Sequence, residues 1–239
     1  VTAFNWAPFR DCSALNDITF HKYPGDNTSN TIIDLNGSLS NTGDYTTDAF
    51  KNIKNDAIFT IFTDETFTIS STGVTAEKYS YHIIGTSIAA DAFKDQTDLL
   101  SVDISNSVTT IGDNAFRNCS NMTSCTLPDN DEFKIIPERC FYESGLTSIT
   151  IPNTVTEIST AVFYHTDISS NLLVLPDSVN TIGSFAFSAC HKIKSCTLPT
   201  NPDFKIIPRS CFYSSSGLLS ITIPYSVTMI DDYAFAHCS

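Results

Sequence analysis

The stretch LTSITIPNTVTEISTAVF, residues 146–163, recurs with variations through most of the chain. With Phe163 as the anchor, apolar residues lie 5, 8, 12, 14 and 17 positions earlier. The same five offsets from Phe116 and from Phe235 meet apolar residues again, and those from Phe187 meet four. A motif that returns in register at this length is typical of a chain that coils repeatedly around one core.

Three further anchors complete the series. Phe141 and Phe212 fit once two extra residues are allowed after Pro128 and Pro199, and Phe93 ends a degenerate first copy. In that copy the apolar slots are filled by Tyr79, Tyr81 and Ile88. The seven copies are spaced 22 to 25 residues apart, which predicts a solenoid.

A second periodicity lies above the first. The segment NAFRNCSNMTSCTLP at 114–128 returns as FAFSACHKIKSCTLP at 185–199, offset by 71 residues. At the same offset, FKIIPERCFY at 133–142 returns as FKIIPRSCFY at 204–213. These two matches indicate that three repeats were duplicated together as a block.

The alternation within one copy predicts a strand. In SITI, residues 148–151, apolar side chains alternate with hydroxyls, as in a half-buried strand. Pro152 ends it, because proline cannot donate a hydrogen bond to a neighbouring strand. One coil buries about six apolar side chains at roughly 2 kcal/mol each, whereas ordering each residue costs roughly 1–2 kcal/mol. A single coil therefore cannot fold alone, and we expect the copies to stack with their strands in a parallel sheet.

The pattern LxxIxIPxxVxxIxxxAFxxC over residues 77–239 resembles the BspA-like leucine-rich repeats of bacterial and protist surface antigens. The resemblance implies an α/β or mainly β repeat protein: a right-handed leucine-rich-repeat solenoid with a parallel β-sheet on its concave face. It also implies a secreted or cell-surface location and adhesion to host or extracellular-matrix proteins. The family brings no catalytic residues and no cofactor.

Residues 1–76 lack the repeat and are expected to form an N-terminal cap over the first coil. Within them, residues 44–55 favour a helix, and the alternation on both sides of Asp64-Glu65 favours a β-hairpin at 57–70. A separate small domain is the alternative.

The composition narrows the classes of partner. The 239 residues carry 26 acidic and 13 basic side chains, a net charge of −13. This charge disfavours nucleic acid and anionic membranes as partners, and it serves either solubility or binding of a cation or a basic partner. The chain contains no apolar run of 18 residues and hence no predicted membrane span.

The two ends of the sequence raise separate expectations. No basic and apolar leader precedes Val1, so either a signal was removed or the sequence is a fragment. At the other end, the strand at 218–223 is expected to leave an open edge through which copies could associate. Either the natural protein continues past Ser239, or residues 224–239 cover their own end.

The eight cysteines suit an extracellular disulfide framework in number but not in position. Cys125 and Cys196 occupy inward strand slots, and Cys140 and Cys211 replace the small residue before the anchor phenylalanine. The nearest pairs between coils are expected to be too far apart to bridge. Free, buried thiols are therefore predicted, with disulfides as the alternative.

The outward strand residues form the candidate binding face. They fall into two rows rich in serine and threonine, of which one is expected to place Lys78 beside Ser101 and the other Ser80 beside Asp103. Leu172 and Val174 interrupt these rows with two neighbouring apolar residues, which could anchor a protein partner. The alternative is a solvated face without a ligand. The candidate binding residues are Asp103, Ser124, Thr126, Ser148, Thr150, Leu172, Val174, Ser195 and Thr197.

Other chemistry has weaker support. The acidic run at 129–132 could attract calcium, but its duplicate Thr200-Asn201-Pro202-Asp203 does not keep the carboxylates, and no metal site or cofactor is predicted.

The Asn-x-Ser/Thr pattern gives four candidate glycosylation sites, with chance matches as the alternative. They are Asn27, Asn36, Asn118 and Asn121. The histidines are dispersed, and no nucleophile with a base is found, so we do not expect an enzyme.

Three function classes remain. The first is a cell-surface or secreted adhesion module that binds a host or extracellular-matrix protein, which the family resemblance favours. The second is a surface-coat or spacer array with no strong ligand. The third, a carbohydrate binder, is weak because the hydroxyl rows lack aromatic platforms.

Overall fold

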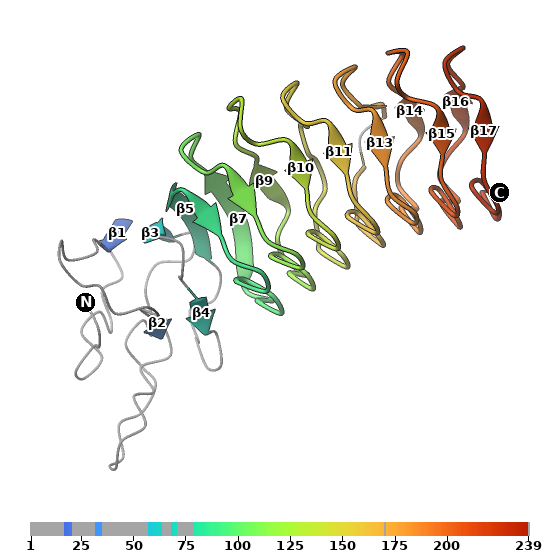
Figure 1. Cartoon of the computed structure of the whole chain (residues 1–239). Coiled ribbons are helices and arrows are strands. Elements are labelled where there is room, and N and C mark those ends of the chain that lie inside the picture. Colours follow the sequence, from blue (N-terminus) through green and yellow to red (C-terminus); the bar gives the residue numbers. More distant parts are fainter. Residues whose placement is uncertain are drawn as a thin grey trace.

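The computed structural model describes the backbone of residues 17–20, 32–34, 57–63, 68–70, 79–169 and 171–238. It describes the side chains of residues 80–83, 85–169 and 171–238. Within these ranges the chain winds into stacked coils that follow one another from β5 to β17 (Figure 1). Every strand pairing is parallel, and no α-helix occurs among the described residues, so the predicted parallel-strand solenoid is confirmed.

One side of the coils is the first strand row, which contains the strands foreseen from the alternation. It is made of β1 (Asp17–Phe20), β3 (Ala57–Thr63), β5 (Tyr79–Gly85), β7 (Leu99–Ile104), β9 (Ser124–Thr126), β12 (Leu173–Val174), β14 (Ser195–Thr197) and β16 (Ser220–Thr222). The order β1-β3-β5-β7-β9 forms one sheet and β12-β14-β16 another.

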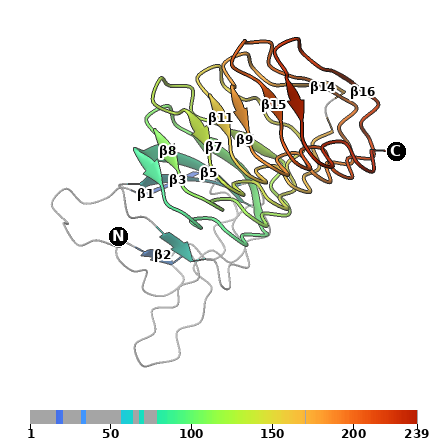
Figure 2. The same ribbon diagram turned by 45° about the vertical axis from the view of Figure 1, so that its right-hand side comes forward.

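A second side, the second strand row, consists of shorter parallel strands, and from β6 onward the sequence analysis did not foresee them. They are β2 (Ile32–Asp34), β4 (Thr68–Ser70), β6 (Ser87–Ile88), β8 (Thr110–Ile111), β10 (Ile135–Ile136), β11 (Glu157–Ile158), β13 (Thr181–Ile182), β15 (Ile206–Ile207) and β17 (Met229–Ile230). Most span only two residues, too few to show alternation. The two rows lie on different sides of the core (Figure 2).

The third side of each coil, the turn side, carries the anchor phenylalanine. In every coil the residues two before and two after the anchor have a positive φ, from Asp91 and Asp95 to Tyr233 and His237. These turns let alternate N–H groups donate to the next coil; the Phe116 N–H, for example, donates to the Cys140 carbonyl at 2.9 Å. The turn side is thus a third ladder of hydrogen bonds between coils.

The core is a column of stacked aromatic rings surrounded by aliphatic side chains. From Phe93 to Phe235 each anchor ring stacks on the next, with centroids 5.1 to 5.6 Å apart. Apart from Ile149 and most slots of the last coil, the apolar slots of the repeat are buried in the described coils, including Met122 and Phe133 in the coil with two extra residues. Stacking of whole coils therefore supplies the burial that one coil lacks.

The first coil does not have the predicted register. Tyr81, not Tyr79, pairs with Val102 and is buried. The stretch from Tyr81 to Phe93 is two residues shorter than the one from Val102 to Phe116, so counting back from the anchor overshoots.

The hairpin predicted at 57–70 is wrong. Strand β3 pairs in parallel with β1 and β5, whereas β4 pairs in parallel with β2 in another sheet. The alternation of apolar and polar residues shows which side chains of a strand are buried. It does not show whether two successive strands pair with each other in a hairpin or join two different sheets at a corner. The predicted helix at 44–55 lies outside the described residues, and the capping role of residues 1–76 stays a prediction.

Candidate functional site

The outward face of the first strand row carries the predicted hydroxyl rows. Ser101, Ser124 and Ser148 lie in register, and so do Ser195 and Ser220. Hydroxyls contact each other at one end, where the Ser101 Oγ donates to the Ser80 Oγ at 2.6 Å. These side chains form a narrow polar strip along the stacked strands.

The start of this face corrects one prediction. Ser80 pairs with Ser101 and His82 pairs with Asp103, so the row that placed Ser80 beside Asp103 is wrong by two residues. The His82 Nδ1 lies 2.7 Å from the Asp103 Oδ2, a hydrogen-bonding contact that sequence analysis missed. Lys78 lies outside the described residues. Asp103 therefore already has a partner within the fold.

Leu172 and Val174 project into solvent, as predicted. They are 51% and 55% exposed, whereas Leu173 between them is buried. In the next coil they face Ser195 and Thr197, because Val174 pairs with Thr197. The two apolar side chains are thus neighbours on a face of hydroxyls.

The first strand row is interrupted beside this pair. The coil of residues 148–150 keeps one bridge, from Ser148 to Ser124, and within the described part of the chain it has no strand pairing with β12. Ile149 is only partly buried, although the equivalent Val102 and Cys125 are buried. The second strand row stays continuous through β10, β11 and β13. The coils are therefore less closely paired on the face where Leu172 and Val174 lie.

Polar contacts frame the pair on both sides. The Ser195 hydroxyl donates to the Asn171 carbonyl at 2.7 Å, and the Lys192 Nζ lies 2.9 Å from the Asp167 Oδ1. On the other side, the Thr200 N–H and hydroxyl donate to the Asp177 carboxylate, which lowers the pKa of that carboxyl. The surroundings are hydrophilic, and the apolar pair stands out from them.

The acidic loop at 129–132 has a structural explanation. The Asn130 side chain accepts the N–H groups of Glu132 and Phe133 and donates to the carbonyls of Asn106 and Val108. Asn201 makes the matching set of bonds in the duplicate. Both loops are held by an asparagine, which sequence analysis missed. No group of three or more His, Cys, Asp or Glu in the described ranges could hold a metal ion.

The described cysteines are free thiols, as predicted. All except Cys238 are buried, and Cys12 lies outside the described residues. Burial raises the pKa of the Cys190 thiol to about 11 and that of Cys119 to about 12. The thiols of Cys119, Cys190 and Cys238 each donate to the carbonyl of the preceding anchor at 3.0 Å. This slot, three residues after the anchor, is therefore a hydrogen-bond donor as well as a small side chain.

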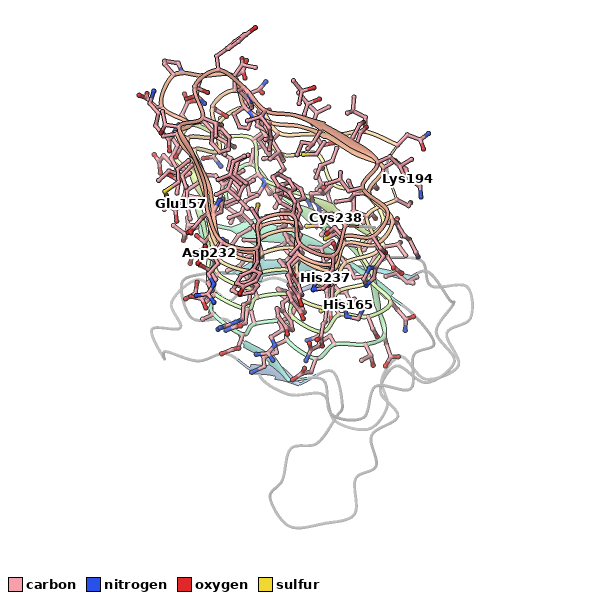
Figure 3. The ribbon with its side chains drawn as sticks, turned by 90° about the vertical axis from the view of Figure 1, so that its right-hand side faces the viewer. Glu157, His165, Lys194, Asp232, His237 and Cys238 are labelled. Atoms are coloured by element: carbon pink, nitrogen blue, oxygen red, sulfur yellow. The ribbon has the colours of Figure 1, made fainter. Side chains whose placement is uncertain are left out.

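Three histidines, His165, His191 and His237, lie on the turn side, whereas His82 lies on β5 of the first strand row and His21 lies outside the described residues. Figure 3 places His165 and His237 there, away from Lys194, whereas Glu157 and Asp232 lie toward the second strand row. The His191 Nδ1 lies 3.2 Å from the Ser216 Oγ. The neighbouring Cys190 thiol instead faces the Phe163 carbonyl, so the two do not form a nucleophile–base pair.

Two candidate glycosylation sites fall in the described part of the chain. The Asn118 Nδ2 donates to Asp95 and the Asn121 Nδ2 donates to the Thr97 carbonyl, both at 2.6 Å. In the fold these amides link adjacent coils. Asn27 and Asn36 lie outside the described residues.

Comparison with known proteins agrees with this architecture. The family described as "BspA type Leucine rich repeat region (6 copies)" matches residues 86–173 and 134–239. The chain belongs to this family, which confirms the resemblance seen in the repeat.

Solved structures show the same fold. A leucine-rich repeat protein of T. pallidum is similar over 72% of this chain and 78% of its own, at 24% identity and a TM-score of 0.58. A leucine-rich repeat protein from Bacteroides ovatus is similar over 65% of this chain and 45% of its own, at 27% identity and a TM-score of 0.52. No curated protein matches. Among the described residues, no helix is long and apolar enough to cross a membrane.

Proposed function

We propose that this chain is a protein-binding module of a cell-surface or secreted protein, and that Leu172 and Val174 anchor a host or extracellular-matrix partner. The observation that carries the proposal is the exposure of both side chains beside the interruption of the first strand row. Exposed apolar side chains have no role in the core, and they gain free energy when a partner covers them.

The surroundings suit a protein ligand. Hydroxyls of Ser148, Thr150, Ser195 and Thr197 border the apolar pair in the adjacent coils, and a polar rim around an apolar centre is the usual anatomy of an interface. Ser124 and Thr126 extend this rim by one further coil. Membership of the BspA-type family supports a surface location and an adhesive role by analogy.

The test is binding of the purified chain to a panel of extracellular-matrix proteins and host cells, with Leu172→Asp beside the wild type. We expect the variant to lose binding, because a buried unpaired carboxylate is costly at an interface. Thr181→Asp places the same charge on the second strand row and should bind normally. Equal binding by Leu172→Asp would exclude the anchor, and no binding by any form would favour a spacer array.

Self-association through the edge of β16 stays a separate prediction. Ile230 on the adjoining β17 is 52% exposed, whereas Ile207 in the preceding coil is buried. Sedimentation at increasing concentration would detect association, and a monomer at every concentration would exclude it.

A further inference from the structure

Shortly after β12 the chain carries a charge that the fold does not require. Asp177 is exposed and comes three residues after Val174, so their Cα atoms are at most about 11 Å apart. The Asp177 Oδ1 accepts the Thr200 N–H at 2.6 Å and the Thr200 hydroxyl at 3.0 Å. In the equivalent position 71 residues earlier, the Asn106 Oδ1 accepts the Asp129 N–H at 2.8 Å. A neutral amide therefore makes the same contact with the main chain of the next coil as the carboxylate does.

The second oxygen of the Asp177 carboxylate is available to a partner. Among the described residues, the Oδ2 atom has no hydrogen-bond donor and the carboxylate has no salt bridge. The two hydrogen bonds from Thr200 lower the pKa of the carboxyl, so the group is charged at neutral pH. An exposed charge without a partner in the fold attracts molecules of opposite charge.

A second carboxylate lies in the loop of the next coil. The Asn201 side chain donates to the Asp177 carbonyl at 2.6 Å and accepts the Asp203 N–H at 2.9 Å, so one asparagine contacts both aspartates. Asp203 is exposed and forms no salt bridge with a described residue. The nearest cation in sequence, Lys205, leads into β15 of the second strand row. Two negative charges therefore follow the ends of β12 and β14.

The starts of the same two strands have the opposite charge. Lys194 directly precedes β14, and the Ser195 hydroxyl donates to the Asn171 carbonyl at 2.7 Å, so Lys194 lies near the start of β12. Lys194 is exposed and has no salt bridge within the described part of the chain. The exposed pair Leu172 and Val174 thus lies between a cation at the strand starts and two carboxylates beyond the strand ends.

We propose that the partner anchored by Leu172 and Val174 is a basic segment of a protein, with a lysine or arginine that meets Asp177 and Asp203. This inference rests on the proposed function and adds the chemistry of the partner. Charge complementarity identifies the segment, because the hydroxyls that border the apolar pair are neutral and the two carboxylates attract a cation. Lys194 repels a second cation at the other end, so the basic group of the segment lies toward the loops.

The test is a nuclear magnetic resonance titration of the chain with three short peptides, in which two leucines are followed by two lysines, two glutamates or two serines. We expect the lysine peptide to bind most tightly and to shift the resonances of Leu172, Val174 and Asp177. Its affinity should fall as salt is added, because salt screens exposed charges. Asp177→Asn should weaken binding of the lysine peptide about three- to fivefold, the effect of one exposed ion pair.

Matched variants control for the fold and for the place of binding. Asp177→Asn should fold, because Asn106 occupies the equivalent position and makes the same contact. Glu157→Gln removes the same charge from the second strand row, on the opposite side of the coils from Lys194 in Figure 3, and should bind like the wild type. Leu172→Ser with Val174→Thr in one chain should abolish binding of the lysine peptide.

Three outcomes would overturn the proposal. The first is equal affinity for the three peptides, or binding of none of them. The second is unchanged affinity of Asp177→Asn for the lysine peptide. The third is capture of matrix proteins that depends on Leu172 but neither on salt nor on Asp177, which would keep the proposed function and exclude a basic partner.

Discussion

The two blocks related by the 71-residue offset, residues 101–142 and 172–213, share their interior and differ on their surface. Cys125 and Cys196 are buried in equivalent strands, and Cys140 and Cys211 are buried before equivalent anchors. Asn130 and Asn201 make the same four hydrogen bonds. Positions that hold the coils together have therefore kept the same residues in both blocks.

Exposed positions have changed toward apolar residues in the second block. At the 71-residue offset, Asn114 corresponds to Phe185, Ser101 to Leu172 and Asp103 to Val174. None of these changes improves the core, since all three residues of the second block are exposed. The comparison separates the residues that the fold needs from those that are free to serve binding, and the proposed anchor pair, Leu172 and Val174, lies in the second block.

The largest expected effect tests the shared interior. Phe116→Ala and Phe187→Ala each remove a fully buried ring from the aromatic column, so each should lower the free energy of unfolding by about 3–5 kcal/mol. Urea denaturation of the two variants measures this. If the two variants lost free energies of unfolding that differ by more than about 2 kcal/mol, the cores of the two blocks would not be equivalent.

The buried thiols predict a dependence on alkaline pH. Because burial raises the pKa of Cys190 to about 11, its neutral form stabilises the fold fully below pH about 9, and this contribution is lost between about 9 and 11. The free energy of unfolding should fall by roughly 1.4 kcal/mol per pH unit for each such thiol. Cys190→Ser should reduce the slope, because a serine hydroxyl does not titrate in this range of pH. The variant should fold, since Ser215 occupies the equivalent position after Phe212 and its hydroxyl donates to the Phe187 carbonyl. An unchanged slope would contradict the account.

The two loop asparagines should be equally important. Asn130→Ala or Asn201→Ala leaves two carbonyls of the preceding coil without a donor, which should cost about 2 kcal/mol in either block. Thermal unfolding followed by circular dichroism measures both. Asp131→Ala in the same loop serves as the control. If an alanine variant of either asparagine had wild-type stability, that asparagine would not be needed to hold its loop to the preceding coil.

The smallest effect concerns Phe185, which lies two residues before the anchor Phe187 and has a φ of 60°. Phe185→Asn should leave the free energy of unfolding unchanged or raise it by up to about 1 kcal/mol, because asparagine tolerates the left-handed backbone better. The same denaturation experiment measures it. A loss of more than about 1 kcal/mol would mean that the ring packs on the fold after all.

The repeat, the inward slots and the free thiols of the described coils could be predicted, because a core position repeated in register imposes the same residue type each time. The spacing of the repeat could not reveal that the first coil is shorter, since Tyr79 and Tyr81 each fit an inward position of its strand equally well. The hydrogen bonds of Asn130 and Asn201, and the positive φ two residues before each anchor, depend on backbone geometry that the pattern of apolar residues does not record. Leu172 and Val174 could be found because two neighbouring apolar residues break the rows of hydroxyl side chains.

The most direct measurement returns the second block to the ordinary residues of the hydroxyl rows, with Leu172→Ser and Val174→Thr in one chain. Capture of matrix proteins and host cells is measured alongside the thermal midpoint. The account predicts that binding is lost while the midpoint stays within a few degrees of the wild type, because neither side chain contributes to the core. Retained binding, or a collapse of stability, would contradict it.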